Sequence, residues 1–267
     1  MSALSYTITD SATMLRRNLR RLLHYPSMTL LLVGMPIVFL LLFVYVFGGQ
    51  LGTGLSHELA GGRAGRAGYL NYVAPGILLM TVAAAVQGTA IVVAMDMTGG
   101  IIDRFRTMAI ARASVLTGHV LASLIQAVAG IAIVLGIAIT LGFRPTAGPA
   151  DWLAAIGVLL LFAVALIWLA TALGLAAKSV ETASNTPMFL TLLPFLGSGF
   201  VPTATMPAGL RQFATYQPFT PVTETVRGLL TGTPIGWNAI AAIAWSVGIA
   251  VASYLWARYL YDHRHAR

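Results

Sequence analysis

Apolar residues occur along this chain in long blocks, without the regular polar positions that give a soluble helix or strand a wet face. Five blocks are long enough to cross a hydrocarbon core of about 30 Å, for which an α-helix needs about 20 residues. Each of them predicts a transmembrane helix. The blocks cover residues 28–47, 72–95, 117–141, 152–177 and 237–259.

One further apolar block is shorter and contains a proline. It runs from Pro187 to Val201, about 15 residues, with Pro194 inside it. To cross the core it must take in polar residues at its start. We therefore predict a span over residues 182–201, the fifth in chain order, and six spans in all.

The next stretch, residues 206–230, is semi-polar and too interrupted by prolines to span. We expect a pair of short helices that enters the membrane and returns, forming an outer re-entrant hairpin. Irregular backbone is stable at membrane depth only when it contacts protein or lines a wet cavity. Residues 48–68 are rich in glycine and alanine and predict an outer loop.

Residues 11–25 have the pattern of a basic amphipathic helix, which Pro26 ends. Such a helix lies in the membrane interface, with its leucines towards the acyl chains and its arginines towards anionic headgroups. The same residues are also compatible with a charge cluster that only fixes topology. The leucines are Leu15, Leu19, Leu22 and Leu23, and the arginines are Arg16, Arg17, Arg20 and Arg21.

The loop at residues 99–112, after the second predicted span, is short and charged but contains apolar residues with no membrane of their own to enter. In a short helix, Phe105 and Met108 would share one face, flanked by Arg104 and Arg106. An aromatic anchor with arginines and an apolar rim is typical of a docking site for a partner protein. A topogenic loop lying on the bilayer surface explains the pattern equally well.

The composition supports the membrane assignment. Hydrophobic residues make up 58% of the chain and charged residues 9%, against about 25% charged in soluble domains. The 16 basic and 8 acidic residues give a net charge of +8. The arginines lie between apolar blocks, where they orient helices, and form no aromatic-rich patch for nucleic acid.

The basic residues also predict the orientation. With the amino terminus inside, 11 lie in inner segments and 5 in outer segments, so we expect both termini in the cytoplasm. The inner set is Arg16, Arg17, Arg20, Arg21, Arg104, Arg106, Arg112, Lys178, Arg258, Arg264 and Arg267. The outer set is Arg63, Arg66, Arg144, Arg211 and Arg227.

Residue types that carry catalysis are sparse. The one lysine, Lys178, follows Ala177, so the chain has no phosphate-binding Gly-Lys-Ser/Thr loop. The histidines are scattered, cysteine is absent, and we expect no metal site. No charged residue falls clearly within a span, which argues against a proton- or sodium-coupled carrier. The polar residues within spans, which suit helix contacts or the substrate path, are Gln87, Thr89 and Thr191.

Two motifs together carry a family resemblance. The loop contains Gly-Ile-Ile-Asp-Arg-Phe-Arg, from Gly100 to Arg106. The run after the fifth span reads Phe-Val-Pro, Met-Pro, Gln-Pro-Phe-Thr-Pro and Val-Arg-Gly-Leu-Leu, between Phe200 and Leu230. With the basic start and six spans, the chain resembles the permease subunit of type-2 ABC exporters, in the daunorubicin-resistance branch of drug and lipid exporters. It departs at Ala109, where the family often has proline.

The resemblance implies an exporter subunit that two copies of a soluble ATPase drive, with ATP and Mg²⁺ bound by that partner and none in this chain. A second permease copy or a homologous sister would complete the complex within the lipid of a bacterial inner membrane. The coupling helix seated on the ATPase would be Asp103, Arg104, Phe105, Arg106, Thr107 and Met108, and residues 11–25 the connecting helix. The outer gate would comprise Pro207, Pro218, Pro221, Glu224 and Arg227.

Two other functions remain open from the residues themselves. A carrier or channel that works without ATP would transport its substrate in vesicles that contain this chain alone. A membrane-embedded enzyme would need carboxylates, histidines or a metal cluster converging at one membrane face.

Overall fold

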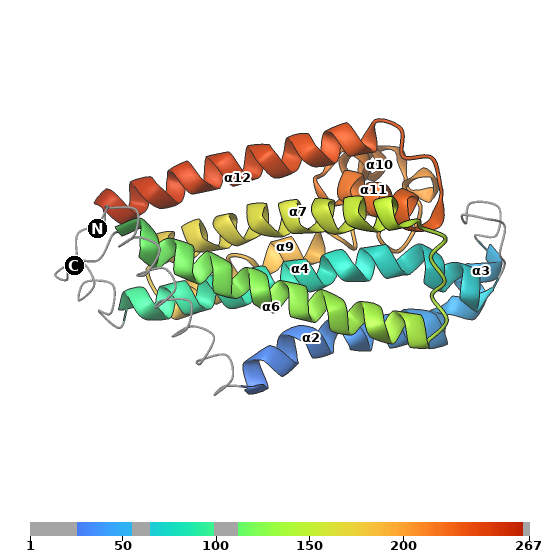
Figure 1. Cartoon of the computed structure of the whole chain (residues 1–267), viewed down its shortest axis with the longest axis horizontal. Helices are drawn as coiled ribbons and strands as arrows, with labels where there is room; N and C mark the ends of the chain where they lie inside the picture. Colours follow the sequence, from blue (N-terminus) through green and yellow to red (C-terminus); the bar gives the residue numbers. More distant parts are fainter. Residues whose placement is uncertain (1–25, 55–64, 99–111, 264–267) are drawn as a thin grey trace.

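Long apolar helices run side by side along one axis of the protein (Figure 1). The computed structural model describes residues 26–54, 65–98 and 112–263, and within these ranges it contains helices and no strands. The helices of the first half are α2 (Pro26–Leu41), the π-helix η1 (Leu42–Phe47), α3 (Gly48–Gly54), α4 (Arg66–Thr98) and α6 (Arg112–Thr140). Those of the second half are α7 (Pro149–Ala176), α8 (Val180–Asn185), α9 (Met188–Leu192), the short η3 (Thr203–Thr205), α10 (Ala208–Tyr216), α11 (Phe219–Thr231) and α12 (Asn238–His263).

Five helical segments are long and apolar enough to cross a membrane. They are Leu32–Gly54, Arg66–Thr98, Thr117–Thr140, Pro149–Ala176 and Asn238–Tyr261, which correspond to the five long blocks of the sequence. The all-α prediction is therefore confirmed, together with five candidate spans. Some helices extend past the predicted ends, as α4 does by six residues at its start.

The prediction of a loop over residues 48–68 is wrong at both ends, because residues 48–54 form α3 and α4 begins at Arg66. The first span continues through η1 into α3, as far as Gly54. Glycine allows this because α3 lies directly against the start of α4: a Cβ added at Gly52 would lie 2.2 Å from the Gly65 carbonyl oxygen. The Gly65 N–H donates to the Gly52 carbonyl at 3.1 Å. Glycine-rich composition alone therefore predicts a loop where the structure has a close contact between two helices.

Helix α4 lies at the centre of the bundle, and almost every side chain from Gly68 to Ala94 is buried. Its neighbours include α2, α6, α7, α8, α9 and α11. Small residues let these helices approach, as where a Cβ at Gly174 of α7 would meet the Ala90 carbonyl oxygen at 2.7 Å. The central position of α4 makes it the element against which the others are placed.

The predicted fifth span, 182–201, is not one continuous helix. It consists of α8, α9 and a series of turns from Leu193 to Phe200. Pro187 and Pro194 lack the N–H groups that a continuous helix would need at those positions. We refer to residues 178–201 as the return segment, because α7 and α12 run in the same direction in Figure 1 and the chain between them must come back.

Contacts with α4 show how the return segment runs. The Ser184 carbonyl accepts from Gln87, the Ser198 carbonyl from Tyr72, and the Phe200 carbonyl from Tyr69. Rising numbers on the segment meet falling numbers on α4, so the two are antiparallel. Tyr69 and Gln87 are 18 positions apart on α4, about 27 Å at 1.5 Å per residue, a length close to the thickness of a hydrocarbon core.

The bundle has two distinct ends (Figure 1). Helices α3, α10 and α11 and the α6–α7 loop gather at one, which we call the α11 end. Helices α4 and α12 finish, and α6 begins, at the opposite end. The proline-rich stretch 206–230 forms two short helices, α10 and α11, as predicted, and their re-entry into the membrane stays a prediction. The connecting helix (residues 11–25) and all of the coupling loop before Arg112 lie outside the described residues.

Candidate functional site

A buried arginine on α11 joins three elements at the α11 end. Arg227 is 2% exposed. Its Nε donates to the Tyr72 carbonyl at 3.2 Å, its Nη2 donates to the Ser198 carbonyl at 2.7 Å, and its Nη1 pairs with Glu224. We call Arg227, Glu224, Tyr72 and Ser198 the Arg227 cluster. It connects α11, α4 and the return segment through a single guanidinium group.

The ring of Tyr72 completes the surroundings of this charge. The guanidinium carbon lies 3.8 Å from the centre of the ring, a cation–π contact. The Tyr72 hydroxyl donates to the Ser198 carbonyl at 2.9 Å, so this carbonyl accepts twice. A guanidinium group is not deprotonated in proteins, so Arg227 stays charged. Its charge is thus compensated by one carboxylate and fixed by two backbone carbonyls.

Glycines bring the backbones of α4 and the return segment close enough for these bonds. A Cβ at Gly76 would lie 2.5 Å from the Gly199 carbonyl oxygen. No side chain fits there without moving one backbone away from the other. Because Ser198 is next to Gly199, this contact sets the position of the carbonyl that Arg227 and Tyr72 share.

The start of α11 is held by a second polar group. The Gln217 amide nitrogen donates to the Leu193 carbonyl and to the Thr220 hydroxyl, both at 3.2 Å, and its oxygen accepts from the Phe219 N–H at 3.1 Å. The Thr220 hydroxyl also accepts from the Ser198 N–H at 3.2 Å. Among the described residues, Ser198 Oγ is the buried side-chain polar atom without a hydrogen-bond partner. Helix α11 is therefore tied to the return segment at two successive points.

A cavity of about 230 Å³ adjoins the cluster. Tyr72, Glu224 and Arg227 line its inner side, and Thr203, Ala204 and Thr233 are among the residues nearer the surface. The Glu224 side chain is 30% exposed, whereas that of Arg227 is 3% exposed. The carboxylate is consequently the charge that faces the accessible side.

The structure separates the predicted gate residues into two groups. Glu224 and Arg227 pair as the i, i+3 spacing indicates, and Pro221 is buried beside them in α11. Pro218 precedes the first turn of α11 and Pro207 precedes that of α10, where a missing N–H costs little. Their roles in gating stay predictions.

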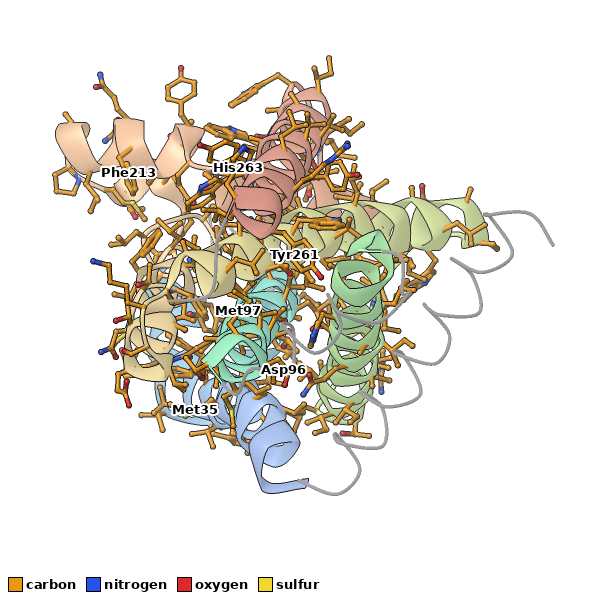
Figure 2. The ribbon with its side chains drawn as sticks, turned by 90° about the vertical axis from the view of Figure 1, so that its left-hand side faces the viewer. Met35, Asp96, Met97, Phe213, Tyr261 and His263 are labelled. Atoms are coloured by element: carbon orange, nitrogen blue, oxygen red, sulfur yellow. The ribbon has the colours of Figure 1, made fainter. Side chains whose placement is uncertain are left out.

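Helix α10 stands apart from the bundle, as Figure 2 shows at its residue Phe213. Phe213 is 49% exposed and Tyr216 is 63% exposed. The Trp245 indole N–H of α12 donates to the Tyr216 carbonyl at 3.1 Å, which fixes the end of α10. The two helices of the hairpin thus differ: α11 belongs to the core and α10 covers its edge.

The candidate residues of the substrate path do not converge. The Gln87 amide donates to the Ser184 carbonyl at 3.2 Å and so joins α4 to the return segment. Thr89 and Thr191 donate to carbonyls of their own helices, those of Ala85 and Met188. The structure gives each of the three a hydrogen bond within the protein, and a contact with substrate stays a prediction.

The opposite end contains a buried pair that joins α4 to α6. His119 Nε2 lies 3.3 Å from a carboxylate oxygen of Asp96, and their side chains are 4% and 2% exposed. Figure 2, viewed from this end, shows Asp96 and Met97 at the end of α4, and Met97 packs against the apolar cluster that includes Tyr261 of α12. Asp96 and His119 flank residues 99–112, so the pair fixes the helix ends from which the predicted coupling loop departs.

Sequence reasoning missed several of these residues. Tyr69, Tyr72, Ser198 and Gln217 form hydrogen bonds between segments far apart in the chain. Neither Asp96 nor His119 was among the candidate residues of the sequence. The sequence indicates that a polar residue beside an apolar span needs a hydrogen-bond partner. It does not indicate which segment of the chain supplies that partner. No group of three or more His, Cys, Asp or Glu among the described residues could hold a metal ion.

A bundle of long apolar helices, in which the described residues bury charges only near the two ends, is that of an integral membrane protein. Residues 10–231 match the family described as ABC-2 type transporter, and because this covers most of the chain, the chain belongs to that family. The resemblance found in the motifs is thereby confirmed. Members are transporter permease subunits and not themselves catalytic, and the family implies assembly with an ATPase partner.

Similar proteins include permeases associated with drug resistance. The daunorubicin resistance ABC transporter permease protein DrrB1 of Streptomyces coeruleorubidus is 27% identical over 261 residues, covering 97% of this chain and 88% of that protein. The probable doxorubicin resistance ABC transporter permease protein DrrC of Mycobacterium tuberculosis is 24% identical over 177 residues. That match covers 65% of this chain and 64% of the relative.

Proposed function

We propose that this chain is the membrane subunit of an ATP-driven exporter, working with two copies of a separate soluble ATPase that binds ATP and Mg²⁺. Membership of the ABC-2 family carries the proposal. A second permease copy, or a homologous sister, completes the path. The complex lies in a bacterial inner membrane with both termini of the chain in the cytoplasm, as the distribution of basic residues favours.

The return segment serves as the sixth pass of the bundle. Its contacts along about 27 Å of α4 support this role, although it is broken at prolines. Broken backbone is stable within a membrane where protein covers it, and α4 covers this segment with hydrogen bonds from Gln87, Tyr72 and Tyr69.

The Arg227 cluster acts as the outer gate. In the described structure one guanidinium joins α11, α4 and the return segment, which supports a role in keeping the exit shut. Opening the exit separates these elements and exchanges the three hydrogen bonds of Arg227 for other partners. ATP binding in the partner supplies the free energy for that change through the coupling loop.

The Asp96–His119 pair gives the opposite end the stiffness that this transmission needs. A push on residues 99–112 moves the ends of α4 and α6 together, because the pair joins them. Helix α4 then carries the displacement along the bundle to Tyr72, which belongs to the gate.

The substrate is an amphipathic compound, a hydrophobic drug or a lipid, taken from the cytoplasm or the inner leaflet. The printed names of the relatives, which refer to daunorubicin and doxorubicin resistance, support a drug. Among the described residues the buried charges, Asp96 and Arg227, lie near the two ends, and the buried residues between them are mainly apolar.

Copurification with the ATPase tests the proposal. A tagged chain, solubilised in mild detergent, retains an ATPase encoded beside it. The double variant Arg104→Ala, Phe105→Ala loses most of it while still inserting into the membrane. The matched control Arg144→Ala, with an exposed arginine in the α6–α7 loop at the α11 end, retains it. Normal retention by the double variant would show that docking does not occur at residues 103–108.

A further inference from the structure

The cavity beside the Arg227 cluster is a site that the gating role does not require. A gate needs the Arg227 guanidinium and its three hydrogen-bond partners. These contacts are made within the Arg227 cluster and do not use the space of the cavity. The cavity nevertheless has Glu224 on its inner side and opens to the surface at Ala204, which is exposed. A polar hollow at the exit of the path is placed to hold part of a molecule.

The accessible groups of the cavity are mainly hydrogen-bond acceptors. The Glu224 carboxylate is 30% exposed and uses Oε1 for Arg227. Thr203 and Thr233 add hydroxyl oxygens. Arg227 lines the cavity but is 3% exposed and already donates through each of its three nitrogens. A ligand entering from the surface therefore meets the negative member of the pair first.

We propose that this cavity binds the ammonium group of a primary amine, with the Glu224 carboxylate as its main partner and the threonine hydroxyls as further acceptors. The inference rests on the proposed function, because it places the site at the exit of the export path. Arg227 positions the carboxylate by holding its Oε1.

The volume of the cavity limits the size of the ligand that it can hold. Sites for drug-sized molecules have about 300–1,000 Å³, and this cavity has about 230 Å³. It accommodates an ammonium with a small carbon skeleton, not a whole amphipathic molecule. The ammonium could belong to a transported amine or to a phosphatidylethanolamine headgroup of the outer leaflet, since both present the same group.

Ligand-detected NMR on the chain in lipid nanodiscs measures this binding without any ATPase. The probes are cyclohexylammonium, cyclohexanol and cyclohexanecarboxylate, which share a ring and differ in charge. We expect cyclohexylammonium to bind in phosphatidylcholine nanodiscs, and the other two at least about tenfold more weakly, as expected for a charge-assisted hydrogen bond. Equal binding of the three probes would overturn the proposal.

Variants assign the site. Glu224→Gln keeps an acceptor for Arg227 but removes the negative charge, and it should weaken cyclohexylammonium binding about tenfold. Ala204→Leu fills the cavity, leaves the charge pair intact and should have a similar effect, so the site can be tested even if Glu224→Gln misfolds. The control Glu181→Gln removes an exposed carboxylate on α8 and should bind as the wild type does. Unchanged binding in Glu224→Gln or in Ala204→Leu would refute the site.

Two further measurements distinguish the possible sources of the ammonium group and separate this inference from the proposed function. Competition when phosphatidylethanolamine is added to the nanodiscs identifies the headgroup as the natural ligand, and its absence identifies a soluble or transported amine. A chain that binds the ammonium selectively but shows no ATPase-dependent transport would contradict the proposed function alone. A chain that transports but does not discriminate between the probes would contradict this inference alone.

Discussion

Replacing Arg227 by methionine tests whether the cluster holds the α11 end together. The substitution keeps much of the side-chain volume but removes the donors to the Tyr72 and Ser198 carbonyls. A buried acceptor that loses its donor costs about 1–3 kcal/mol. The Ser198 carbonyl keeps its bond from the Tyr72 hydroxyl, so the lower half of that range applies to it. The lost ion pair adds little because Glu224 is partly exposed.

We therefore expect Arg227→Met to lower the free energy of unfolding by about 2–4 kcal/mol. Unfolding of the purified chain in mixed micelles, with increasing denaturing detergent and tryptophan fluorescence as the signal, measures the change. The control is Arg211→Met, since Arg211 is an exposed arginine on α10 whose donors reach only the Met206 carbonyl. We expect less than about 1 kcal/mol there. Equal effects of the two variants would refute the reasoning.

Two further substitutions test close contacts elsewhere in the bundle. Gly76→Ala should destabilise the chain by at least about 2 kcal/mol, because the new Cβ would lie 2.5 Å from the Gly199 carbonyl oxygen. The control Gly34→Ala, with nothing within 4 Å, should be neutral or stabilising by up to about 1 kcal/mol. The same unfolding assay compares the two variants. Asp96→Asn should lower the free energy of unfolding by about 1–3 kcal/mol, because it weakens the buried bond with His119. The control Asp151→Asn, at the exposed start of α7, should lower it by less than about 1 kcal/mol. An effect of Asp96→Asn no larger than that of the control would contradict the role assigned to the Asp96–His119 pair.

The helices could be predicted because their signal is local. Each long block is apolar enough to identify a span by length alone, and five of them reappear as long helices. The prolines at 207, 218 and 221 likewise indicated a broken pair of helices, found as α10 and α11. Where the sequence misled, at residues 48–54, the cause was a contact between backbones: glycines that suggest a loop instead allow α3 to lie against Gly65.

The candidate site was predictable only in part, because most of it is made by contacts between distant segments. Glu224 and Arg227 lie three residues apart on one helix, and their pairing follows from that spacing. Tyr72 and Ser198 are 126 residues apart, and nothing in the local pattern indicates that they meet. Asp96 and His119 lie on either side of a loop, and their pairing depends on the crossing of α4 and α6. A single sequence identifies which residues need partners but not which partners they find.

Transport in inside-out membrane vesicles tests the central claim most directly, that this chain exports its substrate only with a separate ATPase. Vesicles containing the chain, the ATPase or both are given an amphipathic fluorescent dye, with and without ATP. The account predicts ATP-dependent uptake that requires both proteins, is abolished by orthovanadate and is lost in the Arg104→Ala, Phe105→Ala variant. The same uptake by the chain alone, without ATP, would contradict it and identify a carrier or channel.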